Sequence, residues 1–142
     1  MLGRWVSDLE VGDVLGPAEH QVTPFLIREL AHAVENQAEW HHSPAGMVAP
    51  PTVVHPHKAL LLDQACPEGA GPAARLHLEY DATYHRMIPG ARVVTISGEV
   101  TDRYERNGRQ RLVMSFEVRD KVTGEIYTTY RDTSLLSYGR GA

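Results

Sequence analysis

The chain has 142 residues, of which 42% are hydrophobic and 23% charged, the length and composition of one globular domain with a buried core. Its formal net charge of −4 gives no electrostatic reason to expect a nucleic acid or an anionic membrane as a partner. The single cysteine, Cys66, excludes an intramolecular disulfide. We therefore expect one domain over residues 1–142 and no nucleic-acid-binding function.

The N-terminal segment MLGRWVSDLEVGD has no apolar signal-peptide core. No run in the sequence approaches the ~18 apolar residues needed to cross a bilayer. Cys66 lies beside Asp63 and Glu68 rather than basic groups, so a nucleophilic thiolate is not expected there. The expectation is a cytoplasmic protein without a membrane partner.

A helix is predicted from Pro24 to about Asn36. Thr23 can cap its first turn, and Pro24 suits the first helical position because a missing N–H costs nothing there. Apolar residues then recur every three or four positions, as on one helical face: Phe25, Leu26, Leu30, Ala33 and Val34. The segment that follows, residues 36–50, is expected to be irregular.

A second helix is predicted over residues 51–65. Its sequence, TVVHPHKALLLDQA, is mostly apolar with few charges, as expected for a helix that is buried on several sides. Pro56 should kink this helix or confine regular structure to the residues that follow it.

From residue 75 onward apolar and polar positions alternate, which predicts β-strands. The first apolar set comprises Leu76, Leu78, Tyr80, Ala82 and Tyr84. His77 and His85 fall on the other phase and are interpreted as surface or strand-face residues. Turns at Pro89-Gly90, Asn107-Gly108 and Thr123-Gly124 separate the later strands, the last of which covers about residues 125–137.

The predicted order is a short strand, a helix, a loop, a buried helix and then four long antiparallel strands. A single sheet with one apolar face needs a cover, and the second helix is long and apolar enough to supply it. We therefore predict an α+β hot-dog fold, in which an antiparallel sheet wraps around a central helix. Its open sheet edge and partly covered helix favour a dimer.

Several motifs in this order resemble the MaoC-like branch of hot-dog proteins, the (R)-specific enoyl-thioester hydratases and 3-hydroxyacyl-thioester dehydratases. The motifs are VGD near the N-terminus, AVENQAEWHHSP, GMVAPPTVV, and PGARVVTISGEVTDRYERNGRQRLVMSFEVRDKVTGE. The resemblance implies a substrate carried as a thioester on coenzyme A or an acyl-carrier protein, and no cofactor. It also implies a homodimer, or a heterodimer with another MaoC-like subunit.

Active members of the family carry a D-x-N-P-x-H segment whose carboxylate and histidine move protons as water is added or removed. On this pattern Asn36 takes the place of the Asp, and His41 takes the place of the His. Asn36 cannot accept a proton as a carboxylate does, but it can orient water or a hydroxyl. Glu35 and Glu39 are near enough in sequence to supply a base.

The start of the second helix also departs from the active pattern. Active members read I-A-H-G-M, with a Gly N–H for the thioester oxygen, where this chain reads V-A-P-P-T at residues 48–52. Pro51 falls on the Gly position and has no N–H to donate. The backbone around Thr52 is the proposed replacement. The A-P-P form resembles the catalytically silent halves of two-part dehydratases.

The remaining candidates surround these two segments. Trp40 is a candidate wall of the acyl pocket, and Ala49 and His55 are candidate substrate contacts. His42 competes with His41 for the acid–base role, and either His55 or His57 can line a substrate tunnel. No metal site is expected, since no H-E-x-x-H or C-x-x-C pattern accompanies these histidines.

Each candidate has a simpler interpretation, as an exposed loop histidine, an asparagine at a helix end, or a tryptophan packed on the sheet. Three hypotheses follow. The first is a hydratase or dehydratase that uses His41 and Asn36 on an acyl thioester or a polyketide-like intermediate. The second is a non-catalytic acyl-binding subunit, and the third is another reaction such as thioester hydrolysis or cyclisation. Arg86 and Arg92 are candidates for binding the phosphopantetheine arm.

Overall fold

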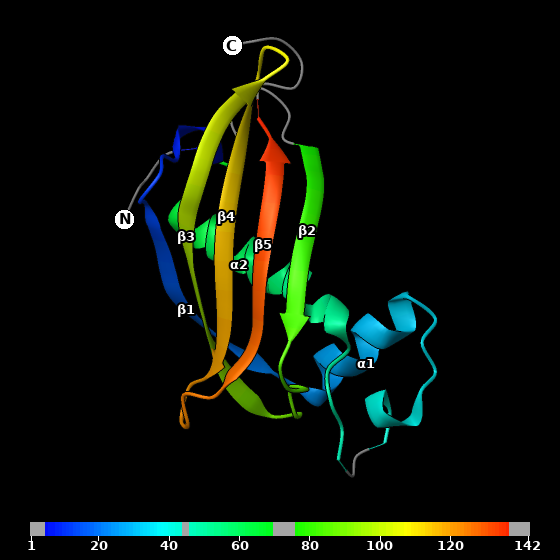
Figure 1. Ribbon diagram of the computed structural model, residues 1–142. Helices are drawn as coiled ribbons and strands as arrows, with labels where there is room; N and C mark the ends of the chain where they lie inside the picture. The colour runs from blue at the N-terminus through cyan, green and yellow to red at the C-terminus, as the bar shows by residue number, and fades with distance from the viewer. Residues whose placement is uncertain (1–4, 44–45, 70–75, 137–142) are drawn as a thin grey trace.

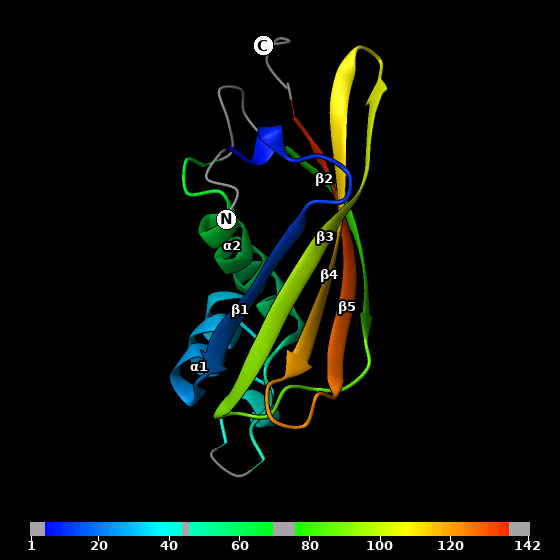
Figure 2. The ribbon, with the colours of Figure 1, turned by 90° about the vertical axis from the view of Figure 1, so that its left-hand side faces the viewer.

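The computed structural model describes residues 5–43, 46–69 and 76–136, and these residues form one antiparallel sheet with helices on one of its faces (Figures 1 and 2). In chain order the elements are η1 (Val6–Asp8), β1 (Val14–Val22), α1 (Pro24–Ala33), η2 (Glu39–His41), η3 (Pro51–Val53), α2 (Val54–Ala65), β2 (Leu76–Tyr84), β3 (Arg92–Arg106), β4 (Arg109–Asp120) and β5 (Ile126–Leu135). The strands lie in the order β1-β3-β4-β5-β2. This arrangement confirms the predicted α+β hot-dog fold.

Two tight turns fix the register of the central strands. Asn107 and Gly108 both have positive φ, 55° and 73°, so the turn between β3 and β4 is of the kind that Asn-Gly favours. At the next turn the Asp120 carboxylate accepts hydrogen bonds from the N–H groups of Val122 and Thr123, at 2.9 and 3.0 Å. The predicted turns at these positions are confirmed.

Helix α2 packs closely on the sheet because two glycines leave room for it. The side chain of Leu61, on α2, is fully buried. A Cβ on Gly16 would lie 2.6 Å from Leu61 Cδ1, and one on Gly98 would lie 3.1 Å from Leu61 Cδ2 and 2.7 Å from Phe116. Side chains at these two positions would therefore push α2 away from β1 and β3.

The helix boundaries differ from the predicted ones. Helix α1 ends at Ala33, not near Asn36, because Glu35 adopts a left-handed φ of 58° and the N–H of Asn36 turns back to the Ala31 carbonyl at 2.8 Å. The second helix begins with the short turn η3 before α2 starts. It continues through Pro56, which lies in the first turn of α2, where an N–H group has no helical partner to lose.

Strand β2 departs from simple alternation. It pairs only with β5, and an irregularity in the register lies between His77 and Glu79. His77 lies opposite Ser134 and Tyr80 opposite Asp132, so the extra residue, Leu78, shifts the phase of the strand. His77 is exposed, as predicted for a surface or strand-face residue. Leu76 and Leu78, members of the predicted apolar set, are 46% and 38% exposed.

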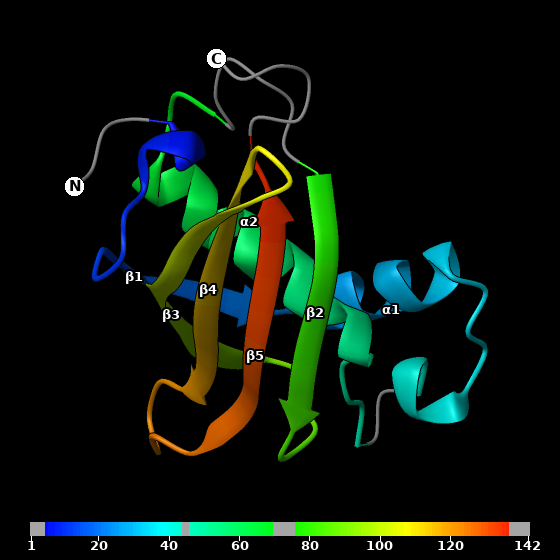
Figure 3. The same ribbon diagram turned by 45° about the horizontal axis from the view of Figure 1, so that its top comes forward.

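Helix α2 crosses the face of the sheet from β2 toward β3, as Figures 1 and 3 show. Its first turn lies near the end of β2, and α1 lies next to it, beyond that edge of the sheet. This arrangement gathers the two segments singled out by the sequence, residues 35–43 and 46–53, at one end of the molecule.

Candidate active site

A cavity of about 130 Å³ lies at the N-terminal end of α2. Its lining comes from the segment before α2 and the segment around the end of β2: Ala49, Pro50, Pro51, Val53, Tyr84, Arg86, Met87, Ile88 and Thr128. The Ala49 N–H donates to the Ile88 carbonyl at 2.8 Å, which ties the two segments together. Two of the predicted substrate contacts, Ala49 and Pro51, therefore line the same cavity.

The first turn above this cavity offers few backbone donors. Pro51 has none, and the Val53 N–H donates to the Pro50 carbonyl at 3.1 Å. The Thr52 N–H lies in the first turn, where helical N–H groups have no partner within the helix. The Thr52 hydroxyl is buried and has no hydrogen-bond partner, although Thr52 is outside the lining of the cavity. Thr52 thus carries a buried hydroxyl that has no hydrogen-bond partner among the described residues.

His41 is held in one orientation. It is buried, with 2% of its surface exposed, and its Nδ1 lies 2.8 Å from the Val48 carbonyl oxygen. Because a carbonyl only accepts, Nδ1 carries the hydrogen and Nε2 presents a lone pair. The Trp40 ring packs edge-on against His41 at 5.9 Å, and the Val48 N–H donates to the Trp40 carbonyl. The histidine is therefore fixed to the segment that leads into α2.

Asn36 and His41 are not joined to each other. The Asn36 side-chain oxygen accepts from the Ala38 N–H at 3.0 Å, which leaves its NH₂ group as the remaining donor. Its backbone carbonyl accepts from His42 Nε2 at 2.9 Å. This hydrogen bond from His42 therefore joins the two ends of the loop over residues 36–42. Neither Asn36, Trp40 nor His41 lines the cavity of the α2 terminus.

The two histidines of α2 have different surroundings. His55 is exposed and packs edge-on against Tyr80 at 5.3 Å. His57 is 1% exposed, packs against His20 at 5.2 Å, and neither of its ring nitrogens has a hydrogen-bond partner. Burial, and then the neighbouring His20, lower the His57 pKa to about 3. Of the two, only His55 is placed to meet a ligand.

Arg86 and Arg92, the candidates for binding a phosphopantetheine arm, lie close to this cavity. Both line a polar hollow next to the cavity, and Arg86 lines the cavity as well. Arg86 lies 3.3 Å from Glu125, and Arg92 lies 3.6 Å from Asp120. Both guanidinium groups are at least half exposed, so they remain accessible to an anion.

Sequence reasoning missed a buried ionic cluster beneath α2. Lys58 of α2 forms an ion pair with Asp132 of β5, and His77 Nε2 lies 2.9 Å from the same carboxylate. The available signal was a lysine within an otherwise apolar helix and an aspartate within a strand. The residue types do not show that Lys58 and Asp132 form a pair. They also do not show the β2 irregularity that brings His77 to the same carboxylate.

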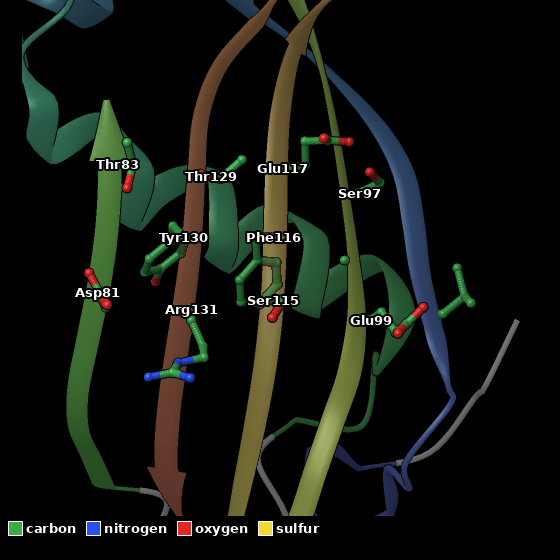
Figure 4. A pocket seen from close by; sticks show the side chains of 12 residues that line it. Asp81, Thr83, Ser97, Glu99, Ser115, Phe116, Glu117, Thr129, Tyr130 and Arg131 are labelled. Atoms are coloured by element: carbon green, nitrogen blue, oxygen red, sulfur yellow. The ribbon is translucent and has the colours of Figure 1, made fainter. Parts of the chain in front are cut away.

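A hollow of about 580 Å³ lies on the opposite face of the sheet (Figure 4). Polar side chains from four strands surround it, among them Asp81, Glu99, Glu117 and Arg131, while Phe116 and Tyr130 point back toward α2. No residue singled out by the sequence lies in this hollow. The candidate site is therefore on the helix-covered face.

Within residues 5–43, 46–69 and 76–136, no three His, Cys, Asp or Glu side chains gather as a metal site would require. In the same ranges, no helix has the length and apolar character needed to span a membrane.

The described residues form a hot-dog fold with a cavity at the start of its central helix. Solved structures of similar fold include the HadBC (3R-hydroxyacyl-ACP dehydratase) complex from Mycobacterium tuberculosis, at 16% identity and a TM-score of 0.77 over 88% of this chain and 96% of that chain. The (R)-hydratase from A. caviae is 17% identical, with a TM-score of 0.72 over 91% and 98%. The ChsH1-ChsH2 complex from Mycobacterium tuberculosis is 18% identical, with a TM-score of 0.70 over 89% and 98%.

No known protein-family model matches the sequence, and no curated protein matches it. The identities to the solved structures are below 25%, so they establish a shared fold. That fold is the one found in MaoC-like dehydratases and (R)-hydratases. The resemblance to the MaoC-like hot-dog proteins is confirmed at this level.

Proposed function

We propose that the protein is a hydro-lyase that hydrates an enoyl thioester or dehydrates a 3-hydroxyacyl thioester. The observation that carries the proposal is the orientation of His41. Its Nδ1–H is committed to the Val48 carbonyl, so its Nε2 is available to take and return a proton. The fold shared with known hydratases and dehydratases supports the same reaction class.

In the dehydration direction, His41 Nε2 removes a proton from C2 and the C2–H electron pair forms the C2–C3 double bond. The C3–O bond breaks, and the hydroxyl leaves as water with the proton that the imidazolium returns. The Asn36 NH₂ group orients the hydroxyl. Donors at Thr52 stabilise the negative charge that develops on the thioester oxygen.

The thioester carrier is expected to lie toward Arg86 and Arg92. A phosphopantetheine arm bears phosphate, and guanidinium groups bind phosphate through paired hydrogen bonds. Arg86 borders both the acyl cavity and the polar hollow, so a carrier arm that leaves the cavity on this side passes Arg86 and Arg92. This position supports coenzyme A or an acyl-carrier protein as the substrate carrier.

The assay is hydration of a crotonyl-CoA probe by purified protein, followed as loss of the conjugated absorbance. His41→Ala is expected to lower the rate about 10²- to 10⁴-fold, the usual contribution of a general acid–base group. His32→Ala, at an exposed position of α1, is the matched control and should leave the rate unchanged. Full activity in folded His41→Ala would overturn the assignment, and release of free thiol would indicate thioester hydrolysis instead.

A second candidate is a non-catalytic subunit that shapes the acyl site of a partner. The observation in its favour is that Pro51 stands where a backbone donor is needed and the Asn36 side-chain oxygen is already occupied. Two of the similar structures are complexes of two proteins. Under this alternative, hydration appears only with an added MaoC-like subunit that carries an intact D-x-N-P-x-H segment, and His41→Ala leaves that rate unchanged.

A further inference from the structure

A second group of ionisable side chains lies under α2, away from the proposed acyl cavity. The Asp132 carboxylate is fully buried and pairs with Lys58, which is 8% exposed. Its Oδ1 accepts from the Ser134 hydroxyl at 3.0 Å. These partners hold the carboxylate in one orientation.

His77 is the third member of this group and is accessible to ligands. Its Nε2 lies 2.9 Å from Asp132 Oδ2 and 3.1 Å from the Glu79 carbonyl oxygen, and both are acceptors. Nε2 therefore carries a hydrogen, and Nδ1 presents a lone pair. The side chain is 36% exposed, so a ligand on this face can reach it. The irregularity at Leu78 is what turns the imidazole to this face.

Polar side chains connect this histidine with the acyl cavity. The Tyr80 ring stacks on His77 at 5.9 Å and also contacts His55. Tyr84 lines the cavity, and its pKa is raised by burial and by its interaction with Tyr80. The distance from Tyr84 to His77 along the strand is about 20 Å. Tyr80 and Tyr84 are 46% and 44% exposed, so the path is accessible.

We propose that His77, oriented by the Asp132–Lys58 ion pair, is the acid–base group of a second site that takes the distal part of an acyl chain bearing hydroxyl or keto groups. Such chains can form hydrogen bonds along the surface between Tyr84 and His77, because this surface presents phenol and imidazole groups rather than aliphatic side chains. Buried or half-buried polar groups favour ligands that hydrogen-bond to them over ligands that leave them unpaired. This inference rests on the proposed acyl-thioester function.

The reaction that this geometry supports is loss of water from a β-hydroxy ketone in the chain. His77 Nδ1 removes a proton from the carbon between the carbonyl and the hydroxyl-bearing carbon, and the electron pair of that C–H bond forms a carbon–carbon double bond. The adjacent C–O bond breaks, and the leaving hydroxyl takes the proton from the imidazolium as water. Asp132 stabilises the imidazolium while the proton is held, and no co-reactant is consumed.

The test compares two N-acetylcysteamine thioesters of equal chain length, a decanoyl thioester and a decanoyl thioester with a β-hydroxy ketone at its distal end. The full chain is expected to bind the oxygenated probe about tenfold more tightly and to convert it to the enone. His77→Gln should bring the two affinities together and abolish enone formation. His85→Gln is the matched control, since His85 is exposed on the same segment but bonds to Thr129.

A separate measurement tests the histidine without turnover. In ¹⁵N-histidine-labelled protein, neutral His77 is expected to be the Nε2–H tautomer, and the oxygenated probe should shift its Nδ1 signal. If only the plain decanoyl probe binds, or if His77→Gln keeps the preference, the inference is wrong. If neither thioester binds, the proposed function fails first. An Nδ1–H tautomer in the wild-type protein would overturn the assigned orientation even if both probes bind.

Discussion

At the scale of single residues, the helix-covered face holds histidines in three different conditions. His41 has one nitrogen committed to a backbone carbonyl, and His77 has one nitrogen committed to a carboxylate. His57 has no partner for either nitrogen and is almost completely enclosed. The first two arrangements fix a tautomer and prepare a base, whereas the third only keeps the ring neutral.

The enclosed imidazole of His57 should make the protein sensitive to acid. Its folded-state pKa is about 3, well below the value of about 6.5 in an unfolded chain, so only the unfolded state takes up this proton between those pH values. The free energy of unfolding should therefore fall by about 1.4 kcal/mol per pH unit from pH 6.5 toward pH 3, relative to a chain without this histidine.

His57→Leu is the corresponding variant. It should be as stable as the wild type or more stable at pH 7, because it replaces unpartnered polar atoms with an apolar side chain. Between pH 6 and pH 4 its stability should fall less steeply than that of the wild type. Urea unfolding at several pH values measures the difference, and parallel pH profiles would contradict this account.

Removing one partner of the buried ion pair between Lys58 and Asp132 should lower the free energy of unfolding. Asp132→Asn leaves a buried lysine without its counter-charge and should cost about 3–5 kcal/mol of unfolding free energy. The double variant Lys58→Met, Asp132→Asn should recover a large part of that loss, because the uncompensated charge is gone. Equal losses in the single and double variants, measured by urea unfolding, would show that the charge itself is not the cause.

At the scale of elements, the close contact between α2 and the sheet depends on two glycines, which have no side chain. Gly16 and Gly98 are the positions that allow the Leu61 side chain to approach the strands. The sequence indicated the helix, the strands and the turns because periodicity and turn residues report them directly. It could not indicate which glycines face the helix, since that depends on the register between β1, β3 and β4.

Gly98→Ala is expected to destabilise the protein by about 1–3 kcal/mol, the usual range for overpacking a core. The added methyl group would lie 2.7 Å from Phe116, a buried aromatic ring that cannot easily yield. Gly108→Ala in the β3–β4 turn is the comparison, because a Cβ there meets no atom within 4 Å and tests only the cost of the positive φ. Thermal unfolding of both variants separates crowding from backbone strain.

At the scale of the whole molecule, the two edge strands, β1 and β2, differ in how readily a strand of a second molecule could pair with them. Strand β1 carries Pro17, which has no N–H to donate and disfavours the addition of a further strand. Strand β2 has no proline and exposes Leu76 and Leu78. The predicted dimer is therefore expected to form along β2.

Leu78→Lys should weaken such a dimer at least about tenfold, because a lysine on an edge strand opposes pairing with a second strand. Sedimentation velocity over a range of protein concentrations measures this effect. Val122→Lys, at an exposed position in the β4–β5 turn, is the control and should leave the association unchanged. A dimer that survives Leu78→Lys would point to another surface.

The sequence predicted that the segments around His41 and Pro51 form two parts of one pocket. Ala49 and Pro51 share a cavity, whereas His41 does not line it. The exposure of His77 was predicted, but its contact with Asp132 was not, because period-two reasoning assumes that no residue is inserted. Asp132 was not singled out, because a buried aspartate and an exposed one look alike in a sequence.

The extra residue in β2 gives a rule for reading other chains of this fold. If the register were regular with Tyr80 opposite Asp132, the residue opposite Ser134 would be Leu78 rather than His77. A strand of this fold that is one residue shorter can keep the imidazole there only if the lost residue lies between His77 and Tyr80. The spacing between this histidine and Tyr80 is therefore a marker that can be checked in any sequence before its structure is known.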